Sequence, residues 1–78
     1  MITPREGELY IQVGALDPDA TRRFVQRLRS EKRDPHVAVG PAPELMRVLI
    51  GPFDNPDALN EQKAQLQSEG IDTFVRQY

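Results

Sequence analysis

The chain contains no cysteine and no tryptophan, and His36 is its only histidine. The absence of cysteine excludes a disulfide framework, a thiolate metal site and a cysteine nucleophile. It suits the cytosol and an oxidising compartment equally, so it does not decide between them. No pair of acidic residues flanks His36 at the spacing of metal ligands. We therefore predict a structural histidine and no metal site.

Long apolar runs are also missing. No stretch approaches the length of a membrane span, and Met1–Pro4 shows no basic region followed by an apolar one. The 78 residues leave room for one core only. We therefore expect residues 1–78 to be one domain of a longer parent protein that carries any export signal or tether. Met1–Glu8 is expected to be a flexible lead-in.

Signatures of catalysis are scarce as well. Ser30 and Ser68 match each other near the ends of the expected helices, and neither lies in a G-x-S-x-G turn. Gly14 and Gly51 lack the glycine spacing of phosphate-binding loops. Four acids are better explained as helix caps than as the paired carboxylates of a glycosidase: Asp17, Asp19, Asp54 and Asp57. We predict no enzyme and no cofactor.

The charge is low, with a formal net value of -2, but it is unevenly distributed. Residues 1–40 carry seven Lys or Arg against six acids, and residues 41–78 carry three against six. The basic side chains gather in one stretch: Arg22, Arg23, Arg27, Arg29, Lys32 and Arg33. A solvated helix face explains this run better than a surface for an anionic polymer.

An internal repeat is the clearest feature that is present. Ile11–Asp17 and Val48–Asp54 share a glycine, a large apolar residue and an aspartate at matching positions. One inserted residue later, Pro18-Asp19-Ala20 matches Pro56-Asp57-Ala58. Further matches are Leu28 with Leu66, Ser30-Glu31 with Ser68-Glu69, and Val37 with Val75. The chain therefore consists of two copies of one structural unit.

Each copy predicts a strand, a helix and a second strand. Alternating apolar residues predict strands over Leu9–Val13 and Arg47–Ile50, each expected to end at a glycine that lets the chain bend. Shorter strands are expected at roughly residues 36–39 and 73–78, and Gly40–Pro43 is expected to be a loop.

The two helix starts carry the same signal. Asp17 or Asn55 caps the helix, and Pro18 or Pro56 takes its first position, where a missing N–H costs nothing. The resulting order, β-α-β-β-α-β, predicts an α+β fold of the ferredoxin or RNP type. This fold is a four-stranded antiparallel sheet with two helices on one face.

The two faces of that sheet receive different residues. We expect the core beneath the helices to contain Ile11, Val13, Phe24, Leu28, Val48, Ile50, Leu66 and Phe74. The other face is left open as a docking surface. We expect it to carry Tyr10, Gln12, Arg47, Leu49 and Val75.

Two segments resemble the signatures of the SPOR (sporulation-related repeat) domain family. They are Gln12-Val13-Gly14-Ala15-Leu16 and Arg47-Val48-Leu49-Ile50-Gly51-Pro52-Phe53, in the right order and each followed by an expected helix. The resemblance covers Leu9 to about Gln77. It implies the same fold, with non-catalytic binding of peptidoglycan glycan strands, especially denuded strands stripped of stem peptides at division sites. It also implies a periplasmic or other extracytoplasmic place in the bacterial cell envelope, with division proteins as further partners.

The resemblance also implies a glycan-binding site. Gln12 and Arg47 match the glutamine and arginine of the family's sheet face, and Val75 matches an aliphatic position on the last strand. Ala15 and Leu45 depart from the pattern, because several members have a serine at the first position and some have an aromatic at the second. Tyr10 and Leu49 share the expected face.

Two other functions remain open from the sequence. RNA-recognition domains use the same topology, but they stack bases on sheet aromatics within a run that is missing here, and the net charge is negative. We therefore expect no nucleic-acid partner. The stronger alternative is a protein-interaction or regulatory module that kept the fold and lost glycan binding, which the departures at Ala15 and Leu45 favour.

Overall fold

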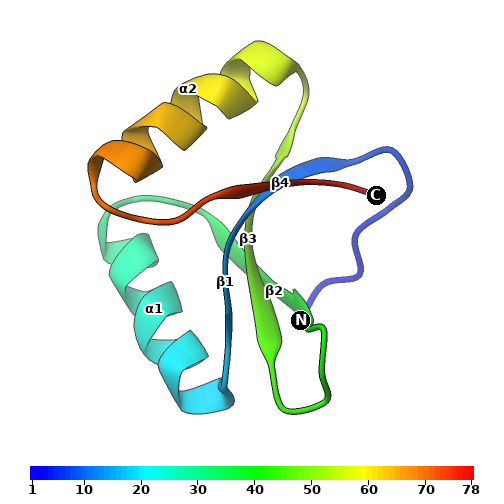
Figure 1. Ribbon diagram of the computed structural model, residues 1–78, viewed down its shortest axis with the longest axis vertical. Helices are drawn as coiled ribbons and strands as arrows, with labels where there is room; N and C mark the ends of the chain where they lie inside the picture. Colours follow the sequence, from blue (N-terminus) through cyan, green and yellow to red (C-terminus); the bar gives the residue numbers. More distant parts are fainter.

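The computed structural model describes all residues, 1–78, as one sheet covered by two helices (Figure 1). The elements follow the order β-α-β-β-α-β, as predicted. Their bounds are β1 Leu9–Leu16, α1 Pro18–Ser30, β2 Pro35–Val39, β3 Met46–Phe53, α2 Pro56–Ser68 and β4 Phe74–Gln77. No helix is long and apolar enough to span a membrane.

The sheet has the strand order β2-β3-β1-β4, and every neighbouring pair is antiparallel. The first strands of the two repeats, β1 and β3, therefore lie side by side in the centre, and β2 and β4 form the edges. Both helices cover the same side, as Figure 1 shows. The predicted fold class is confirmed.

The helix starts form as the sequence predicts. The Ala20 amide donates to Asp17 Oδ1 at 2.9 Å, and the Ala58 amide donates to Asn55 Oδ1 at 2.8 Å. Each cap satisfies an amide that has no partner within the helix. A proline follows each cap directly, so both copies of the repeat begin their helix by the same mechanism.

The main core lies between the helices and the sheet. Its eight buried residues are Ile11, Val13, Val25, Leu28, Val48, Ile50, Leu59 and Leu66. Phe24 is only partly buried and packs against the edge of this cluster. The prediction that Phe74 belongs to the core is wrong, because 61% of its surface is exposed. The pairing of β4 with β1 places Phe74 opposite Gln12, on the side that the helices leave free.

The expectation that each long strand ends at a glycine is also wrong. Gly14 and Gly51 lie inside β1 and β3, which continue to Leu16 and Phe53. The pairing register of these two strands shifts next to Gly14 and again in the Gly51 segment. The glycines therefore mark irregularities within the sheet, where twist increases. Helix α1 begins only after three further residues, and α2 after four.

The C-terminal ends of the two helices are joined through Arg33. Its guanidinium forms ion pairs with Glu31 and with Glu69, which are matching residues of the repeat. The Arg33 side chain is only 11% exposed, so these carboxylates stabilise a nearly buried cation.

Candidate functional site

The sheet surface opposite the helices, here called the free face, is defined by strand register. Residues directly opposite each other in antiparallel strands share a face. One row crosses all four strands: His36 lies opposite Leu49, Leu49 opposite Gln12, and Gln12 opposite Phe74. Ala38, Arg47 and Ala15 form a second row, and Tyr10 lies opposite Arg76.

Five of the predicted site residues lie on the free face: Tyr10, Gln12, Ala15, Arg47 and Leu49. The placement of Val75 there is wrong. Val75 lies opposite Ile11, on the helix side of edge strand β4, and is 48% exposed. The repeat contained a signal for this, because Val37, its match, also lies on the helix side, where it packs against the core.

The centre of the free face is closed. Tyr10 is 3% exposed and Leu49 is fully buried, and with Ala38 they form a second apolar cluster. Ile2 and Tyr78 pack against this cluster, and the rings of Tyr78 and Tyr10 meet edge to face with centroids 5.8 Å apart. Tyr10 and Leu49 therefore stabilise the free face as part of a buried cluster, and they expose little surface to a ligand.

Burial also affects the chemistry of Tyr10. Loss of solvent raises the pKa of its phenol, and a hydrogen bond of 3.1 Å to Glu8 Oε1 adds to the effect. A buried phenol that donates to a carboxylate is held in its neutral form. Tyr10 therefore acts as a structural donor within the free face.

The N-terminal segment forms the cover. Residues 1–8, expected to be a flexible lead-in, carry no helix or strand, but two backbone hydrogen bonds fix their course. The Ile2 amide donates to Val37 O of β2 at 2.7 Å, and the Gly7 amide donates to Tyr78 O, just beyond β4, at 2.6 Å. Because β2 and β4 are the two edges of the sheet, residues 2–7 span its width, on the side away from the helices in Figure 1.

A small hollow of about 210 Å³ remains between this cover and the sheet. Its lining includes Thr3 and Pro4 from the N-terminal segment, with Arg47 and Tyr78 from the free face. Arg47 is half-buried, and its Nη1 donates to Val39 O at 3.2 Å. The arginine is thus held beside the hollow by one hydrogen bond to the β2 edge.

Three polar atoms of the free face are buried without a hydrogen-bond partner: Gln12 Oε1, Arg47 Nε and Tyr78 Oη. An unpaired buried polar group costs about 1–3 kcal/mol. Together these atoms supply an amide acceptor, a guanidinium donor and a phenol. They can satisfy hydroxyl, amide or carboxylate groups of a ligand.

Sequence reasoning missed three members of the free face. Phe74 was assigned to the core, and His36 and Arg76 were not assigned to any face. Arg76 places its Cζ 5.7 Å from the centroid of the Tyr78 ring, and His36 Nε2 lies 3.4 Å from Asp34 Oδ2. In the repeat, Val75 matches Val37, which faces the helices. This match would have assigned Val75 to the helix side and its neighbour Phe74 to the free face.

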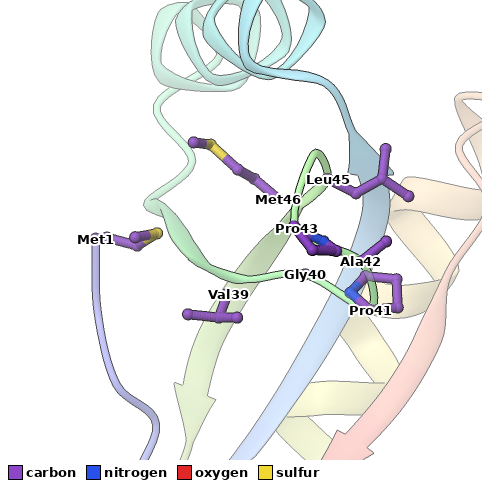
Figure 2. A pocket seen from close by; sticks show the side chains of 8 residues that line it. All are labelled: Met1, Val39, Gly40, Pro41, Ala42, Pro43, Leu45 and Met46. Carbon is purple, nitrogen blue, oxygen red and sulfur yellow. The ribbon is translucent and has the colours of Figure 1, made fainter.

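Leu45, the remaining predicted site residue, belongs to the loop between β2 and β3. It lines an apolar hollow of about 360 Å³ together with Met1, Val39 and the loop residues 40–43. Figure 2 shows Met1 and Val39 on one side of the loop, with Pro41 and Leu45 on the other. The structure therefore places Leu45 beyond the end of the sheet, two residues before Arg47. No group of three or more potential metal-ligating side chains occurs.

Comparison with known proteins identifies the family. The family model of the SPOR domain matches residues 6–77. The chain belongs to the SPOR domain family. Among solved structures, it is similar to the peptidoglycan-binding domain of the B. subtilis cell wall lytic enzyme CwlC, determined in solution. The similarity covers 97% of this chain and 96% of that one, with a TM-score of 0.68 and 23% sequence identity. No curated protein sequence matches the chain.

The similarity to the CwlC domain, at this level of identity, is a similarity of fold. The SPOR match begins at Glu6, so most of the segment that covers the free face lies before the matched region. The family match thus accounts for the sheet and its two helices, and residues 1–5 of the cover lie outside the matched region.

Proposed function

We propose that this SPOR domain binds the glycan strands of peptidoglycan through its free face, without catalysing a reaction. The observation that carries the proposal is the position of Gln12 and Arg47. Both residues of the family pattern lie on the helix-free side of the sheet, and each has a buried polar atom without a partner in the protein. The fold, shared with a domain described as peptidoglycan-binding, supports this ligand.

The chemistry of the two residues suits strands from which stem peptides have been removed. Such a strand exposes ring hydroxyls, acetamido groups and free lactyl carboxylates. The Gln12 amide can donate to and accept from the first two. The Arg47 guanidinium can bind a carboxylate through two parallel hydrogen bonds. We therefore propose denuded strands as the preferred ligand, which places the domain outside the cytoplasm, tethered through other parts of its parent protein and acting at the division site.

Co-sedimentation with purified sacculi tests the proposal. The domain should sediment with sacculi, and more of it should sediment after an amidase has removed the stem peptides. Arg47→Ala should weaken binding by about tenfold or more, because a charge-assisted contact contributes about 1.5–3 kcal/mol. Gln12→Ala should weaken it less, since a neutral hydrogen bond contributes about 1 kcal/mol.

Two further variants make the test specific. Arg47→Lys keeps the charge but loses the planar pair of donors, so it should restore only part of the binding. The triple variant Arg22→Ala, Arg23→Ala, Arg27→Ala removes exposed charge from α1, on the far side of the domain, and should bind as the parent does. Failure of the parent to sediment with amidase-treated sacculi would refute glycan binding and leave the protein-interaction alternative.

A further inference from the structure

The exposed surface of α1 carries most of the positive charge of the domain. Residues 18–33 hold six Lys or Arg against two acids, whereas the other residues hold four against ten. A domain with a net charge of -2 is therefore divided into a segment of +4 and a remainder of -6. Five of the six basic side chains are exposed and are here called the α1 patch: Arg22, Arg23, Arg27, Arg29 and Lys32.

Little of this charge is neutralised within the protein. Arg22 and Arg27 each form one exposed ion pair, at 3.4 and 3.6 Å, with an acid one helical turn away. Exposed pairs of this kind are weak and leave both groups accessible to other partners. Arg23, Arg29 and Lys32 form no ion pair. The α1 patch therefore presents free positive charge to solvent.

The second copy of the repeat shows that the fold does not require these basic residues. Helix α2 begins with the same cap and proline as α1. The positions equivalent to the α1 patch are exposed as well, but none of them is basic. They are Asn60, Glu61, Gln65, Gln67 and Gly70. Helix formation and packing therefore do not explain the arginines of α1.

The charges of α1 cover an area, because they lie on two neighbouring rows of the helix. Arg22 and Arg29, seven residues apart, lie about 10 Å from each other along one row. Arg23 and Arg27, four residues apart, lie on the other row. The exposed surface between the rows is polar and carries no aromatic or large aliphatic side chain. Such a surface suits contact with a charged plane, without insertion into an apolar layer.

We propose that the α1 patch binds the anionic phospholipid headgroups of a membrane surface. Guanidinium groups bind phosphate oxygens through paired hydrogen bonds, and four of the five side chains are arginines. A flat membrane contacts the projecting helix alone. A long polyanion such as a nucleic acid extends beyond the patch and meets the remainder of the domain, whose charge of -6 repels it.

The α1 patch and the free face lie on opposite sides of the sheet, as the position of α1 in Figure 1 shows. The domain can therefore contact a membrane with one side and glycan with the other. The two contacts share no residue, so the membrane inference does not depend on glycan binding.

Co-sedimentation with vesicles of equal parts phosphatidylglycerol and phosphatidylcholine tests the α1 patch. The domain should sediment with these vesicles and not with phosphatidylcholine alone, and added salt should weaken binding. The triple variant Arg23→Gln, Arg27→Gln, Arg29→Gln should lower the partition coefficient about a hundredfold, because each basic residue near an anionic membrane contributes about fivefold. Glutamine already occupies two equivalent positions in α2, so the variant should unfold at nearly the same temperature as the parent.

A pair of single variants separates the α1 patch from net charge. Arg23→Gln and Arg5→Gln change the net charge equally, but Arg5 is an exposed residue of the segment on the other side of the sheet. Arg23→Gln should lower the partition coefficient about fivefold, and Arg5→Gln should leave it unchanged. Equal losses in the two variants, or a triple variant that sediments as the parent does, would overturn the proposal.

Two further measurements identify the partner and separate the two proposals. Duplex DNA should compete poorly with the vesicles at equal phosphate concentration, and effective competition would overturn the assignment to a membrane. Arg47→Ala should sediment with the vesicles as the parent does, although it binds glycan more weakly. If the parent sediments with amidase-treated sacculi and not with anionic vesicles, the membrane inference fails and the proposed function stands. The reverse result refutes glycan binding and leaves the α1 patch.

Discussion

Lys32 and Gly70 have the same backbone conformation at equivalent places, two residues beyond the ends of α1 and α2. Lys32 has a φ of 61° and Gly70 a φ of 79°, both in the left-handed region. In each case the next amide bonds back across the helix end, from Arg33 N to Leu28 O at 3.0 Å and from Ile71 N to Leu66 O at 3.1 Å. The repeat thus uses one C-terminal motif twice, with a glycine in the second copy only.

This equivalence predicts opposite effects of two substitutions. A side chain in the left-handed region costs about 1–2 kcal/mol relative to glycine. Lys32→Gly should therefore raise the free energy of unfolding by about 1 kcal/mol, after part of the gain is offset by the greater freedom of the unfolded chain. Gly70→Ala should lower it by a similar amount, although an added Cβ meets no atom within 4 Å. Urea denaturation of both variants checks this, and equal signs would contradict it.

The two glycines of the repeated strand motif predict a second contrast. Gly51 has a φ of 135°, and a Cβ there would lie 3.0 Å from Leu9 O and 3.2 Å from Tyr10 Cδ1. Gly14 has no positive φ, and its nearest contact would be an ordinary 3.5 Å from Leu16. Gly51→Ala should cost about 3 kcal/mol or more through strain and overlap. Gly14→Ala should stay within about 1 kcal/mol of the parent.

Thermal unfolding of the pair measures the difference directly. The matched positions make Gly14→Ala the control for a methyl group added to a central strand. A comparable loss in both variants would mean that the pairing of β1 with β3 requires a glycine at each site.

The sequence was sufficient for the element order, the helix caps and most of the core, because these depend on local signals such as Asp17 before Pro18. The side to which β4 turns was predicted wrongly for a physical reason. Phe74 and Val75 are adjacent apolar residues in a strand of four, so alternation alone assigns either one to the core. Pairing with Gln12 and Ile11 decides the question, and pairing is a tertiary interaction.

The candidate site was predictable to a similar extent. Gln12 and Arg47 were assigned to the free face because each belongs to a strand with clear alternation. Ala15 was assigned to the site through the family resemblance, and it lies on the free face because the pairing register shifts between Gln12 and Gly14. The cover over that face was not predicted, because residues 1–8 have no periodic pattern. Their course depends on two backbone hydrogen bonds to distant strands and on the apolar contact of Ile2.

Tyr10 predicts a dependence of stability on alkaline pH. Burial raises the pKa of its phenol above the ordinary value of 10.0, with a further contribution from the hydrogen bond to Glu8. The folded state therefore binds this proton more tightly than the unfolded chain. The resulting stabilisation is fully present below pH 10 and is lost as the pH rises through the raised pKa of the folded state.

Urea denaturation across this alkaline range, for the parent and Tyr10→Phe, isolates the effect. The variant should be less stable by about 1 kcal/mol near neutral pH, because it lacks the hydrogen bond to Glu8. Its stability should then fall less steeply with pH than that of the parent. Parallel curves for the two proteins would show that Tyr10 ionises equally easily in both states.

The last prediction concerns the cover over the free face. Ile2 packs on the apolar cluster of Tyr10, Ala38 and Leu49, and its amide donates a hydrogen bond to the β2 edge. Ile2→Ser therefore removes the apolar contact that holds the segment on the sheet and leaves the chain length unchanged. Loss of a half-buried apolar side chain should cost about 1 kcal/mol of stability. Hydrogen exchange at the Ile2 amide should accelerate in the variant, which would show that the segment has been released.

Release of the segment should also affect binding. Arg47 Nε is buried without a partner, in an arginine that lines the hollow beneath Thr3 and Pro4. A ligand that contacts this atom needs the segment to move, and the free energy of that movement reduces the apparent affinity. Ile2→Ser should therefore bind peptide-free glycan several-fold more tightly than the parent, and a chain that begins at Glu6 should behave in the same way. Weaker binding by both variants, with the fold intact, would instead mean that residues 1–5 contact the glycan. The affinity of Ile2→Ser in the Arg47→Ala background distinguishes these cases, because a gain that depends on exposing Arg47 disappears when Arg47 is absent.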